Sequence, residues 1–391
     1  MTRLLRVLSY FLSYMSVEIK KVVSRSDLRK FIRFNYHLYR DNNYFVPELY
    51  PDMVNTLSKT RNPAFEFCEA DYFLAYKGGR LVGRVAAIIN CRANDRWNVR
   101  AVRFGWIDFI DDTEVSEALI SAVAKWGKER GMTQITGPLG FTDFDPEGTL
   151  VEGFDQLGTM STTYNYPYYA SHFERLGFVK DADWVEYKVY VPDAIPEKHL
   201  RISDVVKRKY GLQVRKYKSA RRLVNDYGQK IFDLMNVAYK DLYGYSELTP
   251  KQISLYIKTY LPILDLDMVT LITEADGTLV GVGITMPSLS RALQKAKGRL
   301  FPFGWWHLLR ALFMSKPQII DFLLVAIRPD YQGKGANALL FSDLIPVYQR
   351  KGVKFAETNP ELDMNHKVQS QWFYFDYVQH KRRRSYTKPI D

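Results

Sequence analysis

The 391-residue chain has only two cysteines, Cys68 and Cys91, and no Cys-x-x-Cys pair. Neither a disulfide framework nor a cysteine-based zinc site is therefore indicated, and no metal is expected. No apolar run approaches the roughly eighteen residues that a membrane-spanning helix needs. A reducing cytoplasm is the expected location.

Residues 1–16 are interpreted as an N-terminal extension, with two arginines and a short apolar patch. The patch is too short to cross a bilayer and lacks an Ala-x-Ala type cleavage site. Two interpretations stay open: a weak surface anchor, which would place the protein peripherally on the inner face of the cytoplasmic membrane, or a gene start set too early, with translation beginning at Met15.

Charge and composition indicate a globular chain with an anionic partner. Hydrophobic residues make up 47% and charged residues 25% of the chain, which is long enough for two domains. The formal net charge is +12. CoA, nucleic acid and an anionic lipid surface would all suit this charge, which does not by itself choose among them.

A glycine-containing loop at residues 327–336 lies between a strand-like run at 318–327 and a helix-like run at 336–345. Two glycines at a helix N-terminus direct backbone N–H groups toward one point, where the helix dipole also favours negative charge. A diphosphate would fit there. The Walker pattern is excluded because Lys334 precedes Gly335, and Gly-x-Gly-x-x-Gly is excluded because residue 338 is alanine.

The string Arg-Pro-Asp-Tyr-Gln-Gly-Lys-Gly-Ala, ending at Ala336, resembles the pyrophosphate loop of the GNAT superfamily of acyl-CoA-dependent N-acyltransferases. The resemblance implies an α/β (α+β) fold with a mixed, mostly antiparallel sheet flanked by helices. It also implies acyl-CoA or acetyl-CoA as donor and an amine as acceptor. The cofactor contacts that it implies come from Ile327, Gln332, Gly333, Lys334, Gly335, Ala336, Asn337 and Asn365.

The chain repeats one pattern twice. A strand, turn and strand at residues 73–83 is matched at 270–281, and a short strand at 17–22 is matched at 212–217. Residues 172–178 resemble the end of the second GNAT motif, so the resemblance covers both halves. We predict two tandem GNAT-like domains at 17–195 and 196–391, joined near two prolines at 192 and 196.

The two halves are not equivalent. Where the second half has its glycine loop, the first has Asp111, Asp112 and Glu114. Three carboxylates at a helix N-terminus stabilise the helix and would repel a diphosphate. Only the second half is therefore expected to bind CoA, leaving the first, degenerate half as the acceptor side.

By the GNAT resemblance, the backbone N–H of Val325 or Ile327 polarises the thioester carbonyl. Asp321 stands six residues before Ile327, where several members of the superfamily carry a general base. The apolar strand around Asp321 should raise its pKa. The alternative is a solvent-facing Asp321 or one bonded to a neighbouring loop.

The resemblance does not assign a single group that protonates the departing thiolate. The tyrosine that the resemblance would place in the last helix is replaced by Trp372, which leaves Tyr374 and His366 as candidates, with packing or surface exposure as the alternative for each. Glu357 is open to three interpretations: a base, a group that supports the base, or an exposed residue.

The acidic stretch at residues 143–155 and the tyrosines after it are interpreted as the wall that faces the acceptor, because carboxylates and rings suit an amine with an apolar body. A solvated acidic loop is the alternative, and a calcium loop is disfavoured because residue 154 is phenylalanine. Together with Glu357, the predicted substrate residues are Asp143, Asp145, Tyr164, Asn165 and Tyr168.

Residues 289–317 form an insertion relative to a minimal GNAT domain, with basic residues around tryptophan, phenylalanine and leucine. This pattern is typical of a helix at a membrane surface, or of a helix that packs onto its own domain. The tandem layout and the string Gly-Phe-Asp to Tyr-Tyr at residues 153–169 resemble the bacterial ceramide synthase group. That resemblance implies transfer of a long acyl chain from CoA to a sphingoid-like amine, while the pattern of the insertion leaves contact with a membrane surface open.

Three rival functions remain. An N-acetyltransferase for a small amine or a peptide N-terminus would use the same loop. A non-catalytic acyl-CoA sensor would fit the missing tyrosine. Tandem-GNAT aminoacyl transferases that use charged tRNA do not keep a CoA loop, so no nucleic acid partner is expected.

Overall fold

The computed structural model describes residues 16–390, so the predicted N-terminal extension lies outside the described residues apart from Ser16. The chain divides into two compact units. The first comprises the described residues up to Asp183, together with Lys297–Leu300 and the segment from Arg383 onward. The second comprises Trp184–Ala296 and Phe301–Arg382. Strands β7 (Val179–Tyr190) and β14 (Tyr377–Pro389) contribute residues to both units.

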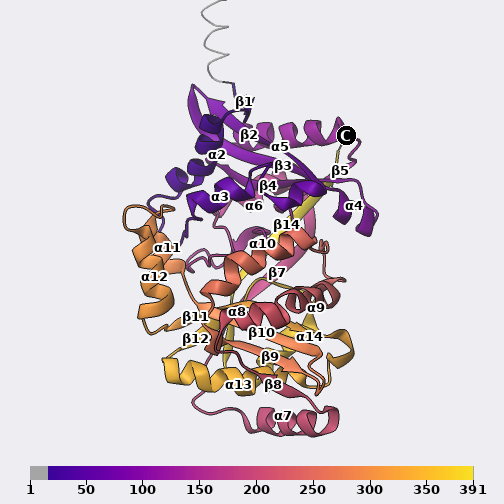
Figure 1. The fold of residues 1–391 in the computed structure, drawn as a ribbon. Helices are drawn as coiled ribbons and strands as arrows, with labels where there is room; N and C mark the ends of the chain where they lie inside the picture. Colours follow the sequence, from indigo (N-terminus) through magenta and orange to yellow (C-terminus); the bar gives the residue numbers. More distant parts are fainter. Residues whose placement is uncertain (1–15, 391) are drawn as a thin grey trace, which may run out of the picture. The chain divides into compact units, whose positions relative to one another are not determined.

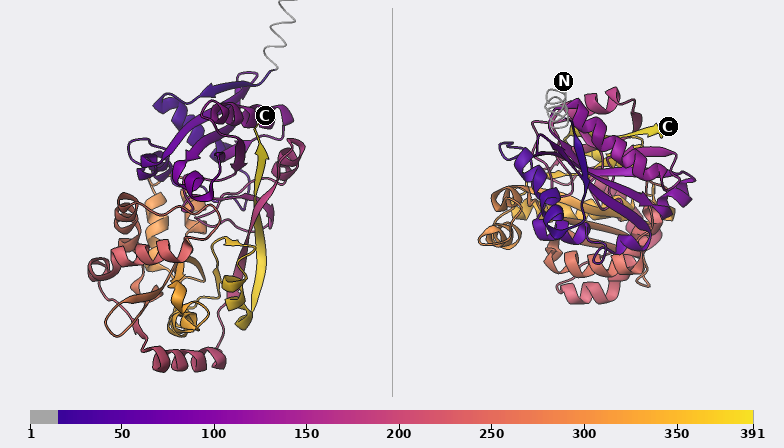
Figure 2. Two further views of the ribbon diagram at one scale, coloured as in Figure 1. Left: turned by 90° about the vertical axis from the view of Figure 1, so that its right-hand side faces the viewer. Right: turned by 90° about the horizontal axis from the view of Figure 1, so that it is seen from above.

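The first unit contains a sheet in the order β1-β2-β3-β4-β5-β14, in which the β4–β5 pair is parallel. Helices lie along the strands (Figure 2). The strands are β1 (Glu18–Lys21), β2 (Cys68–Lys77), β3 (Arg80–Asn90), β4 (Ala101–Phe109) and β5 (Gln134–Gly137), with the short β6 (Thr149–Glu152) outside this order. The helices are α2 (Arg25–Leu38), α3 (Tyr50–Thr56), α4 (Cys91–Trp97), α5 (Thr113–Lys128) and α6 (Tyr168–Arg175).

Side chains of β3 point alternately to the two faces of the sheet, and each face carries its own hydrophobic core. Val85 and Ala87 pack with residues of α5 on one face, while Ala86 and Ile88 pack with Phe31 of α2 on the other. Successive side chains of a strand point to opposite faces. A strand with apolar residues in both registers is therefore covered by helices on both sides.

The second unit repeats this plan, with strand order β7-β12-β11-β10-β9-β8 and a parallel β11–β12 pair (Figure 1). Its strands are β8 (Gln213–Arg215), β9 (Val269–Thr273), β10 (Leu279–Pro287), β11 (Ile319–Ile327), β12 (Phe355–Glu357) and β13 (Glu361–Leu362). Its helices are α7 (Glu197–Tyr210), α8 (Ala220–Leu223), α9 (Gln229–Tyr239), α10 (Pro250–Tyr260), α11 (Ser290–Ala296), α12 (Gly304–Leu309), α13 (Ala336–Lys351) and α14 (His366–Gln369).

Both sheets are mixed and mostly antiparallel, as predicted. In each unit a hairpin is followed by a third antiparallel strand, a helix and a strand parallel to the third one. The predicted hairpin at residues 73–83 is β2–β3, and the one at 270–281 is β9–β10.

Strands β4 and β11 each separate from their parallel partner after three residues. β4 pairs with β5 through Ala101–Arg103, and β11 pairs with β12 through Ile319–Asp321. In the first unit the chain itself enters the opening, because the Leu139 N–H donates to the Phe104 carbonyl at 3.0 Å. A Cβ atom at Gly105 would overlap the Leu139 carbonyl oxygen. This close packing occupies the edge of β4.

Replacing Gly105 with alanine should destabilise the first unit, because the neighbouring backbone must move to admit a methyl group. We expect a loss of about 1–3 kcal/mol, read as a lower midpoint of urea unfolding of the full chain. Gly158→Ala is the matched control, since its Cβ would meet its nearest neighbour, the Tyr44 carbonyl oxygen, at an ordinary 3.4 Å. Equal midpoints for the two variants would contradict the packing described for β4.

Candidate functional site

The predicted anion loop lies at the start of the 16-residue helix α13. Gly333 and Gly335 have φ angles of 72° and 84°, which favour glycine. Gly335 precedes the helix without any side-chain cap, so the first N–H groups of α13 are available to a ligand. The Gln332 side chain holds the loop to the end of β11 by donating to the Ile327 carbonyl at 3.0 Å.

Helix α7 lies along α13 and covers one side of this loop (Figure 1). A Cβ atom at Gly335 would overlap the side chain of Ile202, whereas a Cβ atom at Gly333 would meet no atom within 4 Å. A groove beside the loop has a cationic rim that includes Lys209 and Lys334. An anion can therefore approach the loop from the Gly333 side and meet positive charge there.

Beyond Asp321, the backbone groups of β11 point alternately toward β10 and away from it. The Arg328 N–H donates to the Val280 carbonyl at 2.8 Å, and hydrogen bonds alternate along an antiparallel pair. The backbone groups of Val325 and Ile327 therefore face the opposite side, where β12 has separated from β11. We call this side the open edge of β11.

The carbonyl oxygens on the open edge accept hydrogen bonds from side chains. The Leu323 carbonyl accepts from Asn359 at 3.1 Å, and the Val325 carbonyl accepts from the Tyr239 hydroxyl of α9 at 2.9 Å. The carbonyl groups are thus satisfied inside the unit. Fixed N–H dipoles beside them are the kind of group that stabilises a developing oxyanion.

Asp321 lies at the point where β11 and β12 separate and is 3% exposed. Neither of its carboxylate oxygens has a hydrogen-bond partner among the described residues. Burial, followed by the negative charge of Glu357, raises its pKa to about 7. The expected rise in pKa is therefore confirmed, and a solvent-facing Asp321 is excluded.

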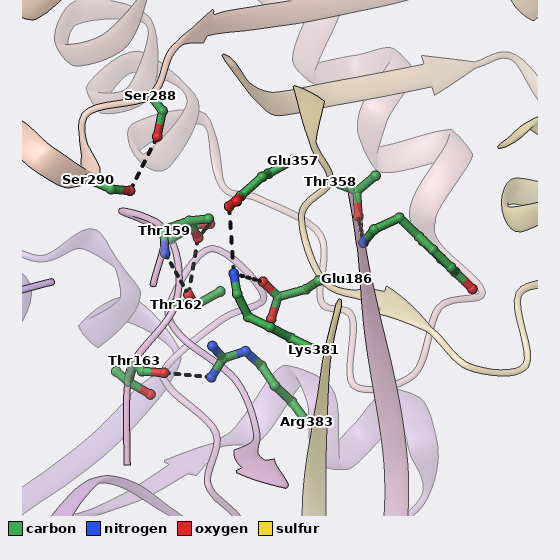
Figure 3. A network of polar contacts seen from close by, with 12 residues as sticks. Thr159, Thr162, Thr163, Glu186, Ser288, Ser290, Glu357, Thr358, Lys381 and Arg383 are labelled. Carbon is green, nitrogen blue, oxygen red and sulfur yellow. Dashed lines mark hydrogen bonds and ion pairs between the residues drawn. The ribbon is translucent and has the colours of Figure 1, made fainter. Parts of the chain in front are cut away.

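A buried ion cluster lies beside Asp321. Lys381 of β14 contacts Glu186 of β7 at 2.9 Å and Glu357 of β12 at 3.6 Å (Figure 3). All three side chains are buried, and burial raises the pKa of Glu357. Glu357 is therefore neither exposed nor isolated, but part of the group that surrounds the candidate base.

The structure places the two candidate acids at the surface. His366 is exposed at the start of α14, and Tyr374 is 41% exposed, with its ring against His199 and Lys198 of the α7 region. Asn365 caps α14 by accepting from the Val368 N–H at 3.3 Å. Their catalytic and cofactor roles remain predictions.

The sequence analysis did not identify two groups near the open edge, Glu361 and Tyr239. Glu361 accepts hydrogen bonds on both carboxylate oxygens from the indole N–H of the buried Trp372, at 3.0 and 3.2 Å. Burial raises the pKa of Glu361 to about 8. It also raises the pKa of Tyr239 to about 12, with the Glu361 charge contributing. Tyr239 and Glu361 belong to no motif, so only their positions in the folded unit identify them.

The predicted substrate residues of the first unit make contacts within it. The Tyr168 hydroxyl donates to the Phe109 carbonyl, and the Tyr164 hydroxyl donates to the Phe154 carbonyl. The Asn165 side chain accepts a hydrogen bond from the Leu150 N–H and donates one to the Leu150 carbonyl. The side chains of Asp143 and Asp145 are at least half-buried, and burial raises the pKa of both carboxyl groups. A role in binding the acceptor stays a prediction for all five residues.

The carboxylates that replace the glycine loop in the first unit stabilise their own helix. Asp112 accepts from the Glu114 N–H at 3.0 Å at the start of α5, and Lys77 pairs with both side chains at 2.6 and 2.9 Å. His172 contacts Asp111 at 2.9 Å. These negative groups stand where an incoming diphosphate would need N–H donors, which supports the expectation that this unit does not bind CoA.

The tandem arrangement matches a solved protein along nearly its whole length. A tandem GNAT protein from the clavulanic acid biosynthesis pathway is 13% identical, with 96% of this chain and 99% of that chain covered and a TM-score of 0.56. The chain has the tandem GNAT fold. A fungal GCN5-related glucosamine N-acetyltransferase region matches with a TM-score of 0.54 and 12% identity, over 96% of this chain and 38% of the multi-domain protein. The predicted fold is thereby confirmed.

Two curated proteins are similar in sequence. Protein YghO of Escherichia coli K12 is 27% identical over 95% of both chains. A bacterial ceramide synthase of Caulobacter vibrioides (strain NA1000 / CB15N) is 29% identical over 82% of both chains. No family model matches the chain. Among residues 16–390, no helix is both long and apolar enough to span a bilayer.

A negative charge placed in the anion loop should weaken CoA binding. Gly333→Asp adds a carboxylate where no atom would be crowded, and we expect about a tenfold rise in Kd. Gly333→Asn is the matched control, because asparagine has the same size and tolerates positive φ angles. Isothermal titration with CoA measures both variants. Equal affinity for the two would exclude this loop as the phosphate site.

Proposed function

We propose that this protein is an acyl-CoA-dependent N-acyltransferase that acts through its second unit. The observation that carries the proposal is Asp321, a buried carboxylate without a hydrogen-bond partner among the described residues. Asp321 is the last residue of β11 that pairs with β12, so the open edge begins next to it, and β11 leads directly into the anion loop. A base, oxyanion donors and a phosphate cradle are thus arranged along one continuous segment.

In this proposal the loop binds the diphosphate of acyl-CoA, and the thioester lies along the open edge of β11. The N–H of Val325 or Ile327 donates to the carbonyl oxygen as it becomes negative. The acceptor enters as an ammonium, which has no lone pair, and Asp321 takes its proton. The amine nitrogen then bonds to the carbonyl carbon, and the carbon–sulfur bond breaks as the thiolate is protonated. The nitrogen gives up its second proton, which restores the group that protonated the thiolate, so that an amide and CoA are formed.

The departing thiolate needs a proton, and Tyr239 is the donor that the geometry favours. Its hydroxyl lies 2.9 Å from the Val325 carbonyl oxygen, on the same side of β11 as the amides of Val325 and Ile327. Tyr374 and His366 lie at the surface instead. Tyr239 comes from α9, so the donor would belong to a different element from the one that the family resemblance implied.

The acceptor we favour is a long-chain, sphingoid-like amine. The similarity to a bacterial ceramide synthase supports this choice. An exposed aromatic patch in the second unit supports it independently, because a lipid acceptor must be taken from a membrane. The patch consists of Phe301, Phe303, Trp305, Trp306, Phe313 and Met314, which are between 41% and 77% exposed. Transfer would then take place in the cytoplasm, at the inner face of the cytoplasmic membrane.

Residues 305–313 of the insertion are only partly packed onto their own unit, with Leu308 and Leu312 half-buried. Trp305, Leu309 and Phe313 are 45%, 38% and 59% exposed, and Arg310 and Lys316 beside them are also exposed. Rings with flanking cations suit an anionic membrane surface, because the rings enter the interface while the cations meet the headgroups.

Purified protein should release CoA thiol from palmitoyl-CoA in the presence of sphinganine. Palmitoyl-CoA and acetyl-CoA are each tested with sphinganine and with polyamines, and free thiol is followed. Release only with acetyl-CoA and a small amine would exclude the lipid acceptor and support a small-amine N-acetyltransferase. CoA binding without release in every pair would show a sensor in place of an enzyme.

The rate of transfer should rise with pH through about pH 7, because Asp321 acts as a base only when it has lost its proton. Asp321→Asn keeps the size of the side chain but cannot take a proton, so kcat should fall by about 10²- to 10⁴-fold. The pH profile of kcat/KM checks the first expectation and the variant checks the second. An Asp321→Asn enzyme with wild-type kcat would assign the base elsewhere.

Trp305→Ser combined with Trp306→Ser should reduce binding to liposomes that contain anionic lipid, since both rings leave the aromatic patch. Flotation with the liposomes measures the bound fraction. Trp97→Ser removes a similarly exposed tryptophan, 39% exposed on α4 of the first unit, and should leave the bound fraction unchanged. Unchanged partitioning of the double variant would refute the membrane contact.

A further inference from the structure

Asp321 and the ion cluster beside it come from four strands, β11, β12, β7 and β14. Asp321 of β11 pairs in register with Glu357 of β12, and Glu357 pairs with Lys188 of β7. Glu186 is two residues from Lys188 and therefore on the same face of β7. Lys381 of β14 lies between Glu186 and Glu357 (Figure 3). The backbone register thus brings these charges to one face of the sheet.

The cluster has an excess of negative charge in a buried place. Asp321, Glu357 and Glu186 are three carboxylates against the single ammonium of Lys381, and all four residues are at most 7% exposed. Lys188 lies at the margin, half-buried with its ammonium over the Phe355 ring. Isolated carboxylates cannot stay ionised at this depth without a counter-charge.

Lys381 is not shared equally among the three carboxylates. Its ammonium is 2.9 Å from Glu186 and 3.6 Å from Glu357, whereas Asp321 has no hydrogen-bond partner among the described residues. The two flanking carboxylates therefore receive the positive charge, and the carboxylate beside the open edge of β11 does not.

We propose that Lys381 is a positioning residue that keeps Glu186 and Glu357 ionised and so confines the exchangeable proton of the cluster to Asp321. This inference rests on the proposed role of Asp321 as the base. Its consequence for the reaction is that the acceptor's proton goes to the carboxylate at the open edge and not deeper into the sheet.

The groups that face Asp321 act on its pKa in both directions. After burial, Glu357 and Glu186 raise the pKa, while the Ser288 hydroxyl and Lys381 lower it. Ser288 follows β10 and bonds to Ser290 at 3.3 Å. Removing any one of these charges should therefore shift the pKa of Asp321 in a defined direction.

Glu186→Gln tests the inference, because it removes one negative charge while keeping the size of the side chain. Lys381 then pairs with Glu357 alone, and the pKa of Asp321 should fall. We expect the acid limb of the pH profile of kcat/KM to move down by about one pH unit. A structural role would lower kcat without moving the limb.

The double variant Lys381→Met with Glu186→Gln is the matched control. It removes one charge of each sign and leaves Glu357 without the ammonium of Lys381, so Glu357 should compete with Asp321 for the proton and the acid limb should broaden into two protonation steps. Lys381→Met alone would leave two buried carboxylates without a counter-ion and would disturb the fold. An acid limb that stays at the wild-type pH in both variants, or moves up in Glu186→Gln, would overturn the inference.

Infrared difference spectroscopy gives a second measure that needs no turnover. The carbonyl stretch of protonated Asp321 is identified by subtracting the spectrum of Asp321→Asn, and its titration midpoint should shift as the acid limb does. Shifted midpoints in a protein that transfers no acyl group would uphold the charge arrangement and reject the proposed function. Acyl transfer with unshifted midpoints would uphold the proposed function and reject the charge arrangement.

Discussion

The separation of β11 from β12 beyond Asp321 is the constraint on which the candidate site depends. The two strands pair for three residues only, Ile319–Asp321 with Phe355–Glu357. Past that point the backbone of β11 has a strand partner on one side and faces side chains on the other. Strand alternation then fixes which amides face the opening. Donor groups are thus held rigidly without a dedicated side chain.

The two units share one plan but differ at the edge of the strand that leads into the helix α5 or α13. Both contain a parallel pair that separates early. In the first unit the edge of β4 is occupied by the segment around Leu139, and the following helix is capped by Asp112. In the second unit the corresponding edge faces side-chain hydroxyl and amide groups, and the following helix begins with Gly335. A few residues therefore separate a filled opening from a usable one.

Buried charge is the second theme of the candidate site. Burying Asp321, Glu357 and Glu186 together opposes folding, because each carboxylate loses its water shell. Lys381 offsets this cost for two of them. Leaving the third without a partner makes that group sensitive to pH near neutrality, as a general base requires.

Much of this protein could be predicted from the sequence because the relevant signals are local. The loop around Gly333 and Gly335 needs a backbone that only a few residues allow, and the hairpins β2–β3 and β9–β10 follow from short-range alternation and turns. The same locality made Asp321 a candidate, because a single carboxylate in an apolar strand stands out. The strand register, however, involves residues far apart in the chain.

Tertiary structure alone decided which groups surround Asp321 and the open edge. Lys381 is 195 positions from Glu186 in the chain, and Tyr239 is 86 positions from Val325, so no sequence window contains either pair. The family resemblance near Trp372 made Tyr374 and His366 candidates for protonating the thiolate, yet both side chains lie at the surface in the fold. The sequence by itself indicated the fold through its resemblance to the GNAT superfamily, and it indicated the repetition and the glycine loop through local patterns of strands and turns. The charges and hydroxyls around the base were decided by strand pairing over long distances, which a linear pattern does not encode.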